Sequence, residues 1–234
     1  MERQRYVRFE HLGRARFGRV APTVDDVTPI EVLSDDPVRT DASPTGELLE
    51  MEEVHFLSPL LPGRVVAVRD AYANAPSDPP RRTTPPCSPH FSLSPPPTPV
   101  NPHTTVDPPA RYAAELAVVI GRDSRVFGYT CANALTPDSL SLGPWIVTGI
   151  DPASLRIGSM VNGVRRQEST TARLPAPVAP LLAHITATTP LAPGDVVLTG
   201  TPTGAGELAP GDWVTVFIEH IGTLGNKVSP SHSH

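Results

Sequence analysis

Several residue types are scarce in this chain of 234 residues. Its two cysteines, Cys87 and Cys131, form no CxxC pair and no metal-ligand spacing, which argues against a disulfide framework and a structural zinc site. The 19 basic residues are fewer than the 24 acidic ones, so a nucleic-acid role, which needs a basic patch, is not expected. No apolar run is long enough to span a membrane, and residues 1–11 lack the apolar region of a signal peptide. We therefore expect a cytoplasmic protein, with a mitochondrial location as the alternative, that binds neither nucleic acid nor membranes.

Proline, by contrast, is abundant, and 13 of the 30 prolines lie between Asp70 and Pro109. Because proline fixes φ and cannot donate to a strand ladder, this segment predicts neither helix nor regular sheet. A flexible linker is the plain interpretation, and a PxxP ligand at Pro96–Pro99 for a partner domain is the alternative. We divide the chain into an N-terminal region of residues 1–68, the proline-rich segment 69–111, a core of residues 112–228 and a tail of residues 229–234.

The pattern of apolar residues predicts a mixed β-rich (α+β) fold with few short helices. Two strands around Leu12-Gly13 and a third over residues 27–33 indicate a small N-terminal β-meander. The acidic stretch 47–53 predicts a helical turn or loop, and residues 64–68 a buried strand. In the core, Asn162-Gly163 predicts a hairpin turn, and the spacing of apolar residues over 175–189 predicts a helix.

The segment Ala113 to Gly121 is an apolar run that carries a single acid, Glu115. Branched residues at odd and even positions predict a strand that is buried on both faces. A carboxylate in such a strand is costly to bury unless something pairs with it. A divalent cation is one such partner, and a backbone N–H cluster or an arginine is the plainer alternative.

The turn Thr199-Gly200-Thr201-Pro202 is the second feature that carries chemistry. Small hydroxyl residues around a glycine let backbone N–H groups approach an anion, so the turn is a candidate for carboxylate binding. A plain structural turn explains the same residues equally well.

Glu115 and this turn belong to a series of segments that resembles the fumarylacetoacetate hydrolase family over roughly residues 112–228. The segments are AAELAVVIG from Ala113, GYTCAN from Gly128, LGPWIVT from Leu142, VNGVRRQ from Val161, PGDVVLTGTPTG from Pro193 and the stretch from Pro210 to Val228. The resemblance implies a mixed β-sandwich roll, a Mg²⁺ or Mn²⁺ site and action on small 2-oxo or β-dicarbonyl acids. The reactions implied are C–C hydrolysis, decarboxylation or keto–enol tautomerisation, often in a homodimer.

The same resemblance assigns the cation to a Glu-x-Glu pair and an aspartate further along the chain. In this sequence those positions are Ala113, Glu115 and Ala134, so one carboxylate of three is present. Asp138 is the nearby acid that could replace a lost ligand, although its Thr-Pro-Asp-Ser context is also typical of a turn.

For the substrate, the resemblance points to Thr201 and Gly200 in the turn, to Tyr72, and to Thr170 in the stretch of hydroxyl residues 169–171. The family's catalytic histidine falls on Ala75, and its substrate-binding lysine falls on Ser94. A serine cannot supply the fixed positive charge of a lysine.

Three hypotheses follow. The chain is a metal-assisted enzyme for a small oxo-acid, a non-catalytic relative that binds such an acid or pairs with an active partner, or a decayed or mis-assembled copy. The short link of residues 122–127, where the family has a helix, predicts exposed apolar surface on the strand that the helix would cover.

Overall fold

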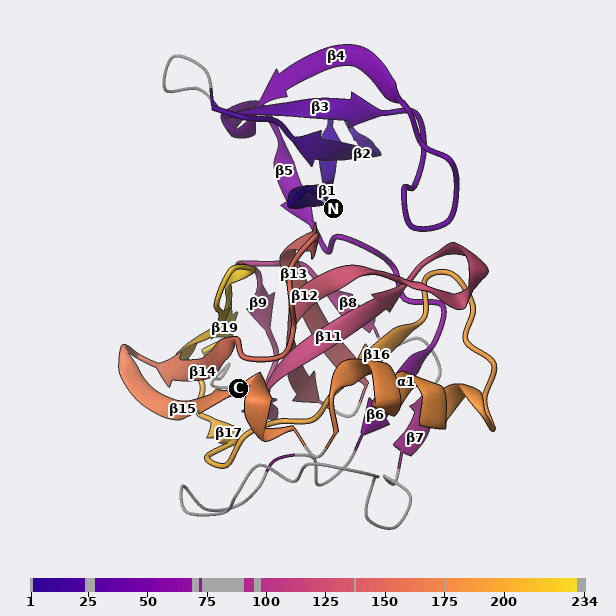
Figure 1. The fold of residues 1–234 in the computed structure, drawn as a ribbon. Helices are drawn as coiled ribbons and strands as arrows, with labels where there is room; N and C mark the ends of the chain where they lie inside the picture. Colours follow the sequence, from indigo (N-terminus) through magenta and orange to yellow (C-terminus); the bar gives the residue numbers. More distant parts are fainter. Residues whose placement is uncertain are drawn as a thin grey trace.

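The strand β11 (Ala114–Ile120) runs through the middle of the molecule, between β12 (Val126–Thr136) and β16 (Val196–Leu198) (Figure 1). Both neighbours pair with it in antiparallel register. Every residue of β11 is buried. The prediction of a strand covered on both faces is therefore confirmed.

The computed structural model describes residues 2–23, 28–68, 72, 91–94, 98–136, 138–174 and 176–230. Within them, β11 belongs to a 12-stranded mixed sheet with the order β4-β3-β2-β1-β13-β12-β11-β16-β6-β7, with β5 and β8 attached to β1 and β13. Its remaining strands are β1 (Gln4–His11), β2 (Arg14–Val20), β3 (Pro29–Leu33), β4 (Pro44–Glu50), β5 (His55–Leu57), β6 (Val65–Val68), β7 (Phe91–Ser94), β8 (Thr98–Val100) and β13 (Ser139–Thr148).

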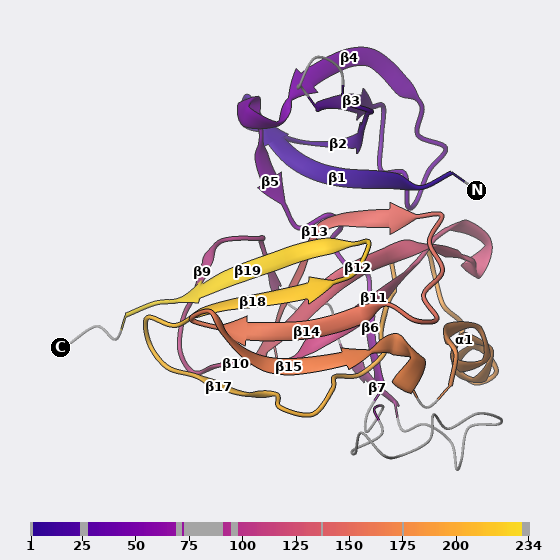
Figure 2. The same ribbon diagram turned by 60° about the vertical axis from the view of Figure 1, so that its left-hand side comes forward.

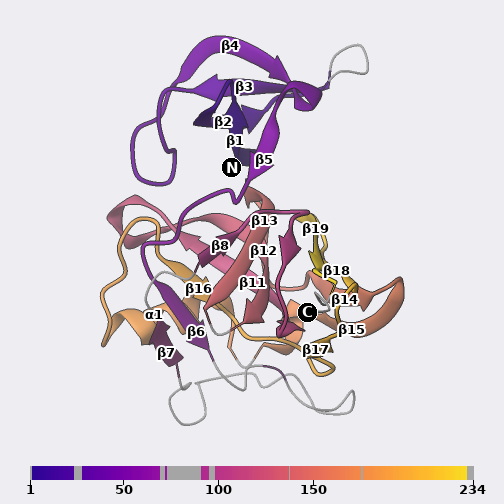
Figure 3. The same cartoon turned by 180° about the vertical axis from the view of Figure 1, so that it is seen from behind.

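The strands β1 to β5 form an N-terminal lobe above the core, and β1 joins the core sheet by pairing with β13 (Figures 1 and 3). The expected strands on either side of Leu12-Gly13 are confirmed. The expectation for residues 47–53 was wrong for its first half, since β4 pairs with β3 and only Met51–Glu53 forms a 3-10 helix, η1. Burial of Leu49 in the core of the lobe accounts for the difference.

A second sheet packs against one face of β11 and β12 (Figure 2). Its order is β15-β14-β18-β19-β9. The strands are β9 (Thr105–Val106), β14 (Arg156–Val161), β15 (Val164–Thr170), β18 (Trp213–Ile218) and β19 (Gly222–Val228). Leu116 and Val118 contribute to the shared core together with Ile157 and Val216. A separate pair of short strands, β10 (Ala110–Tyr112) and β17 (Gly206–Leu208), completes the β-structure.

Helical structure is limited to α1 (Val178–Thr186) and the 3-10 helices η1, η2 (Arg122–Ser124) and η3 (Thr171–Arg173) among the described residues. The predicted helix is confirmed, because α1 buries Val178, Leu181 and Ile185 on one face. The predicted hairpin is confirmed as well, since Asn162 and Gly163 both adopt positive φ, as a two-residue turn requires.

Two expectations fail. The proline-rich segment contains β7, β8 and β9, because short strands that pair along one side tolerate a missing N–H donor. Residues 69–71, 73–90 and 95–97 of that segment lie outside the described residues. The expected exposed apolar surface is also absent from β11, whose two faces pack into separate clusters. No described helix is long and apolar enough to cross a membrane.

Candidate functional site

Glu115 is the buried acid at the beginning of β11, with 8% of its surface exposed. Its carboxylate oxygen Oε2 accepts a hydrogen bond of 2.7 Å from the backbone N–H of Gly200. Ala117 and Val119, which share its face of the strand, pack in the core with Ala132 and Leu142. Of the partners expected from the sequence, a single backbone N–H is therefore the one that the described part of the chain provides.

Burial raises the pKa of Glu115 to about 7, and the hydrogen bond from Gly200 opposes this shift only in part. A carboxyl group with such a pKa exchanges protons readily near neutral pH, which is the property of a general acid or base. The pKa shift reflects the cost of charging a carboxylate in an apolar interior.

The Tyr72 hydroxyl is the second unusual group of the site. It is buried and has no hydrogen-bond partner among the described residues. Burial raises the pKa of the Tyr72 phenol, and the negative charge of Glu115 raises it further, so the two groups interact electrostatically. Because buried polar groups are normally paired, this hydroxyl can serve as a hydrogen-bonding group for a ligand beside Glu115.

Gln167 on β15 ties the 199–202 turn to β11. Its oxygen Oε1 accepts the N–H of Ala114 at 3.0 Å and the hydroxyl of Ser159 at 2.9 Å. Its nitrogen Nε2 donates to Thr201 Oγ1 at 2.8 Å and to the carbonyl oxygen of Pro202 at 2.7 Å. Gln167 is only 1% exposed, so all four hydrogen bonds are shielded from water.

The backbone of the turn depends on glycine. Gly200, which donates to Glu115, has a φ of 88°, and Gly204 has a φ of 96°. A side chain at Gly204 would also collide with the carbonyl oxygen of Arg166 on β15. Thr201 is half-buried next to Gly200, and its hydroxyl accepts the hydrogen bond from Gln167.

The other two sequence-based site residues lie elsewhere. Thr170 is the last residue of β15 and caps η3, since its hydroxyl accepts the N–H of Ala172 at 3.3 Å. Asp138 is exposed in the turn between β12 and β13, where its N–H is bonded to Thr136 Oγ1. Thr136 is four residues beyond Ala132, the partner of Glu115, which corresponds to about 13 Å along the strand. The structure thus does not bring Asp138 to Glu115.

The donor set at Glu115 does not fit a Mg²⁺ or Mn²⁺ ion, which is held by several oxygen ligands. Ala113 and Ala134, the other two positions implied by the resemblance, supply no oxygen from their side chains. The described residues contain no group of three or more His, Cys, Asp or Glu side chains arranged to hold a metal. Ala75, the position of the family's catalytic histidine, lies outside the described residues.

Gln167 was missed as a site residue by the sequence analysis. It closes the VNGVRRQ segment, but nothing in that pattern distinguishes a buried glutamine from the exposed polar residues around it. The register of the β14–β15 hairpin could have identified it. Gln167 lies opposite Ser159, which is completely buried, and opposite residues of a hairpin point to the same face of the sheet.

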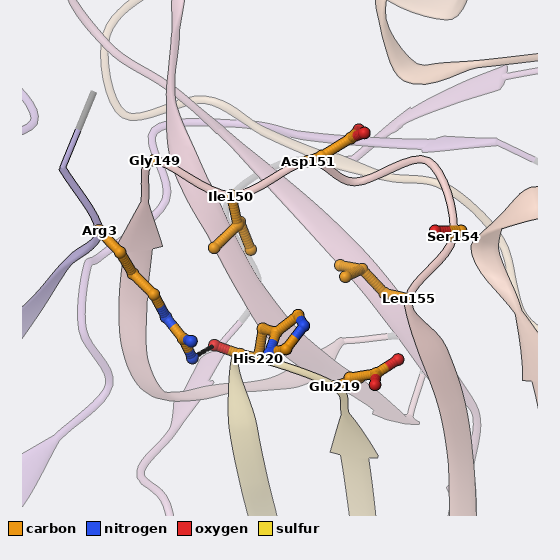
Figure 4. A pocket seen from close by; sticks show the side chains of 8 residues that line it. All are labelled: Arg3, Gly149, Ile150, Asp151, Ser154, Leu155, Glu219 and His220. Carbon is orange, nitrogen blue, oxygen red and sulfur yellow. Dashed lines mark hydrogen bonds between the residues drawn. The ribbon is translucent and has the colours of Figure 1, made fainter.

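A hollow of about 560 Å³ lies between the N-terminus and the loop that leads from β13 to β14 (Figure 4). It is lined by Asp151 and Glu219 as well as Arg3, whose guanidinium donates to the backbone carbonyl oxygen of His220. Gly149 of its wall is seven residues beyond Leu142, the partner of Ala132, or roughly 20 Å along β13. This hollow of mixed charge is therefore separate from Glu115.

Comparisons of the sequence with known proteins identify two matching regions. The pattern described as fumarylacetoacetate (FAA) hydrolase C-terminal matches residues 130–229. The pattern described as Rv2993c-like, N-terminal matches residues 4–59. Protein Rv2993c of Mycobacterium tuberculosis is 32% identical over 219 residues, a match that covers 79% of this chain and 82% of that protein. Maleylpyruvate hydrolase of Aquipseudomonas alcaligenes is 37% identical over 139 residues, and the match covers 48% of each protein.

Solved structures agree with this grouping. The 5-carboxymethyl-2-hydroxymuconate delta-isomerase of Mycobacterium smegmatis is 29% identical and superposes with a TM-score of 0.84, covering 97% of this chain and all of that one. The maleylpyruvate hydrolase of Sphingobium sp. SYK-6, solved with manganese(II) and pyruvate, shares the fold with a TM-score of 0.74, over 97% of this chain and all of that one, at 21% identity.

Proposed function

Because the chain belongs to the fumarylacetoacetate hydrolase family, we propose that it binds a small 2-oxo or β-dicarbonyl acid between Glu115, Tyr72 and the 199–202 turn. The observation that carries the proposal is the pairing of the buried Glu115 carboxylate with the Gly200 N–H, together with the Tyr72 hydroxyl, which has no partner among the described residues and whose pKa the charge of Glu115 raises. These groups complement the carboxylate, carbonyl and acidic carbon of such an acid.

The reaction that these residues support best is isomerisation. Keto–enol conversion only moves a proton between carbon and oxygen, and a double-bond shift through the enol moves it between two carbons. One positioned acid–base group can perform either step. Hydrolysis of a C–C bond also needs an activated water, and decarboxylation needs a strong electron acceptor. The relatives include an isomerase and a hydrolase by name, and the described donor set favours the first.

In this scheme the substrate carboxylate accepts a hydrogen bond from the Thr201 hydroxyl, which Gln167 holds in place. Glu115 removes a proton from the carbon next to the substrate's carbonyl group and returns it at the new position. The Tyr72 hydroxyl donates a hydrogen bond to the carbonyl oxygen, where negative charge develops. The protein stays chemically unchanged, since the proton that leaves carbon returns to the product or to water.

A second candidate is a non-catalytic protein that binds the acid without converting it. It is favoured by the alanines at positions 113 and 134 and by the alanine at position 75, where the family has its catalytic histidine. A homodimer is part of either proposal. Sedimentation velocity would test it, and a monomer at micromolar concentration would contradict it.

The test uses oxalate for binding and pyruvate for chemistry, both in the presence of EDTA. We expect calorimetry to detect oxalate binding to the wild-type protein, and a weakening of roughly tenfold in Thr201→Val. Thr170→Val is the matched control, because Thr170 caps η3, and equal weakening there would support the sequence-based role of Thr170 instead.

Proton NMR in D2O then follows exchange of the pyruvate methyl protons. Isomerase-type chemistry predicts exchange catalysed by the wild-type protein that falls by about 100-fold or more in Glu115→Gln. Oxalate binding without exchange would favour the non-catalytic candidate. Absence of oxalate binding by folded protein would contradict both.

A further inference from the structure

Ala113, Glu115 and Ala134 occupy one face of the ladder between β11 and β12. Glu115 lies opposite Ala132 in the register, and the N–H of Ala134 donates to the carbonyl oxygen of Ala113 at 3.3 Å, which places Ala113 opposite Ala134. Opposite residues of an antiparallel ladder point to the same face, as do residues two apart on one strand. The three Cβ atoms therefore lie within about 8 Å of one another.

The two alanines lie at the rim of this face. Both are half-buried, whereas Ala132, beside Glu115, is completely buried. Longer side chains at positions 113 and 134 can therefore extend toward Glu115 from the solvent side without displacing the core. A Glu at position 113 and an Asp at position 134 would bring their oxygens to a common point with those of Glu115.

The side chains that are present supply little for a cation. Glu115 is the one carboxylate of the three positions, and its Oε2 already accepts the Gly200 N–H. A hard divalent cation held by a single carboxylate and water binds weakly, because affinity rises with the number and charge of its oxygen ligands.

We infer that this face is a cation site with two of its three carboxylates removed and its backbone register retained. The acid ligand is accordingly bound without a divalent cation, and two substitutions suffice to create cation binding. Binding of the acid without a cation rests on the proposed function. Cation binding by the substituted protein does not, because it is measured without any acid.

In the experiment, Mn²⁺ alone is titrated into three purified proteins. Binding is measured by calorimetry and by the electron paramagnetic resonance signal of the free ion. The proteins are the wild type, the double variant Ala113→Glu/Ala134→Asp, and the matched control Ala113→Gln/Ala134→Asn, which has the same side-chain size without the charge. We expect the double variant to bind Mn²⁺ on the order of 100-fold more tightly than the wild type and the control. Adding Glu115→Gln to the double variant should abolish that gain.

Two results would overturn the inference. Micromolar Mn²⁺ binding by the wild type that is lost in Glu115→Gln would mean that further ligands complete the site. A double variant with the circular dichroism and thermal midpoint of the wild type but no gain in Mn²⁺ binding would mean that the three positions do not converge. If the double variant fails to fold, Ala134→Asp alone must still bind Mn²⁺ more tightly than Ala134→Asn.

A separate measurement distinguishes failure of this inference from failure of the proposed function. Oxalate titrations of the wild type with EDTA and with Mn²⁺ should give equal affinities. Oxalate binding that requires Mn²⁺ would contradict the inference and leave the ligand class intact.

Discussion

At the scale of single residues, the burial of Glu115 has a free-energy cost that one hydrogen bond offsets only in part. The Gly200 N–H stabilises the charged form, and desolvation disfavours it more strongly, so the pKa rises to about 7. The folded protein would therefore be more stable with Glu115 in its neutral form than with Glu115 charged. Such a cost at one buried position is typical of a group retained for binding or chemistry.

The pH dependence of stability tests this cost. Because the folded pKa of about 7 lies above the ordinary value of 4.5, the folded state binds the Glu115 proton more tightly than the unfolded chain. The resulting stabilisation is fully present below pH 4.5 and is lost as the pH rises through 7. Glu115→Gln carries no charge at any pH, so its unfolding free energy should exceed that of the wild type by about 3 kcal/mol at pH 8.

Urea denaturation at pH 5 and at pH 8 measures that difference. At pH 5 the difference should shrink to less than about 1 kcal/mol, because Glu115 in the folded protein is then largely protonated. A difference that is the same at both pH values would mean that Glu115 is not buried as the structure describes.

Gln167 offers a second prediction at this scale. Gln167→Met keeps the length of the side chain but leaves the Ala114 N–H, the Ser159 hydroxyl and the Pro202 carbonyl group without their partner. We expect a loss of roughly 3 kcal/mol in unfolding free energy, measured by urea denaturation. Arg165→Met on the same strand is the control, and its exposed side chain should cost less than about 0.5 kcal/mol. Equal effects of the two substitutions would contradict a structural role for Gln167.

At the scale of elements, an ion pair links the residues that directly precede β6 and β16, Arg64 and Asp195. Arg64 Nη2 contacts Asp195 Oδ2 at 2.5 Å, and the same oxygen accepts the N–H of Ala192 at 2.9 Å. Asp195 is 3% exposed, and β6 and β16 run parallel just beyond the contact. The pair therefore fixes the strand that leads into the 199–202 turn.

Removing this contact should be costly. Asp195→Ala removes the counter-ion of a partly buried guanidinium, which keeps its hydrogen bond to the Pro190 carbonyl oxygen, and leaves the Ala192 N–H unpaired. We therefore expect a loss of about 2 kcal/mol in a thermal or urea unfolding experiment. Asp41→Ala is the matched control, since Asp41 pairs with Arg122 at the surface and exposed pairs contribute little. A larger effect at Asp41 than at Asp195 would contradict the assignment.

The sequence predicted those elements whose signal is local. The Asn162-Gly163 turn, the apolar face of α1 and the strand β11 all carry their own pattern of turn residues or hydrophobic spacing. The strand at residues 44–50 and the short strands among the prolines could not be predicted, because they form by pairing with distant strands rather than by intrinsic preference. The same limit hid the role of Gln167, whose four partners come from three separate parts of the chain.

At the scale of the whole molecule, the fold brings β11, β15 and the 199–202 turn together from positions far apart in the sequence. Glu115, Gln167 and Thr201 meet only because two sheets pack face to face (Figure 2). The separate hollow around Arg3 and Glu219 (Figure 4) is lined by residues of the loop that follows β13, Gly149, Ile150 and Asp151.

The most direct test is a titration of ¹⁵N-labelled protein with oxalate in the presence of EDTA, followed by the backbone amide resonances. If the acid binds at the 199–202 turn, we expect the N–H signals of Gly200 and Thr201 to shift most and to saturate together. The shifts should be lost in Thr201→Val. Signals that shift only around Asp151 and His220, or no shifts in folded protein, would contradict binding at this turn.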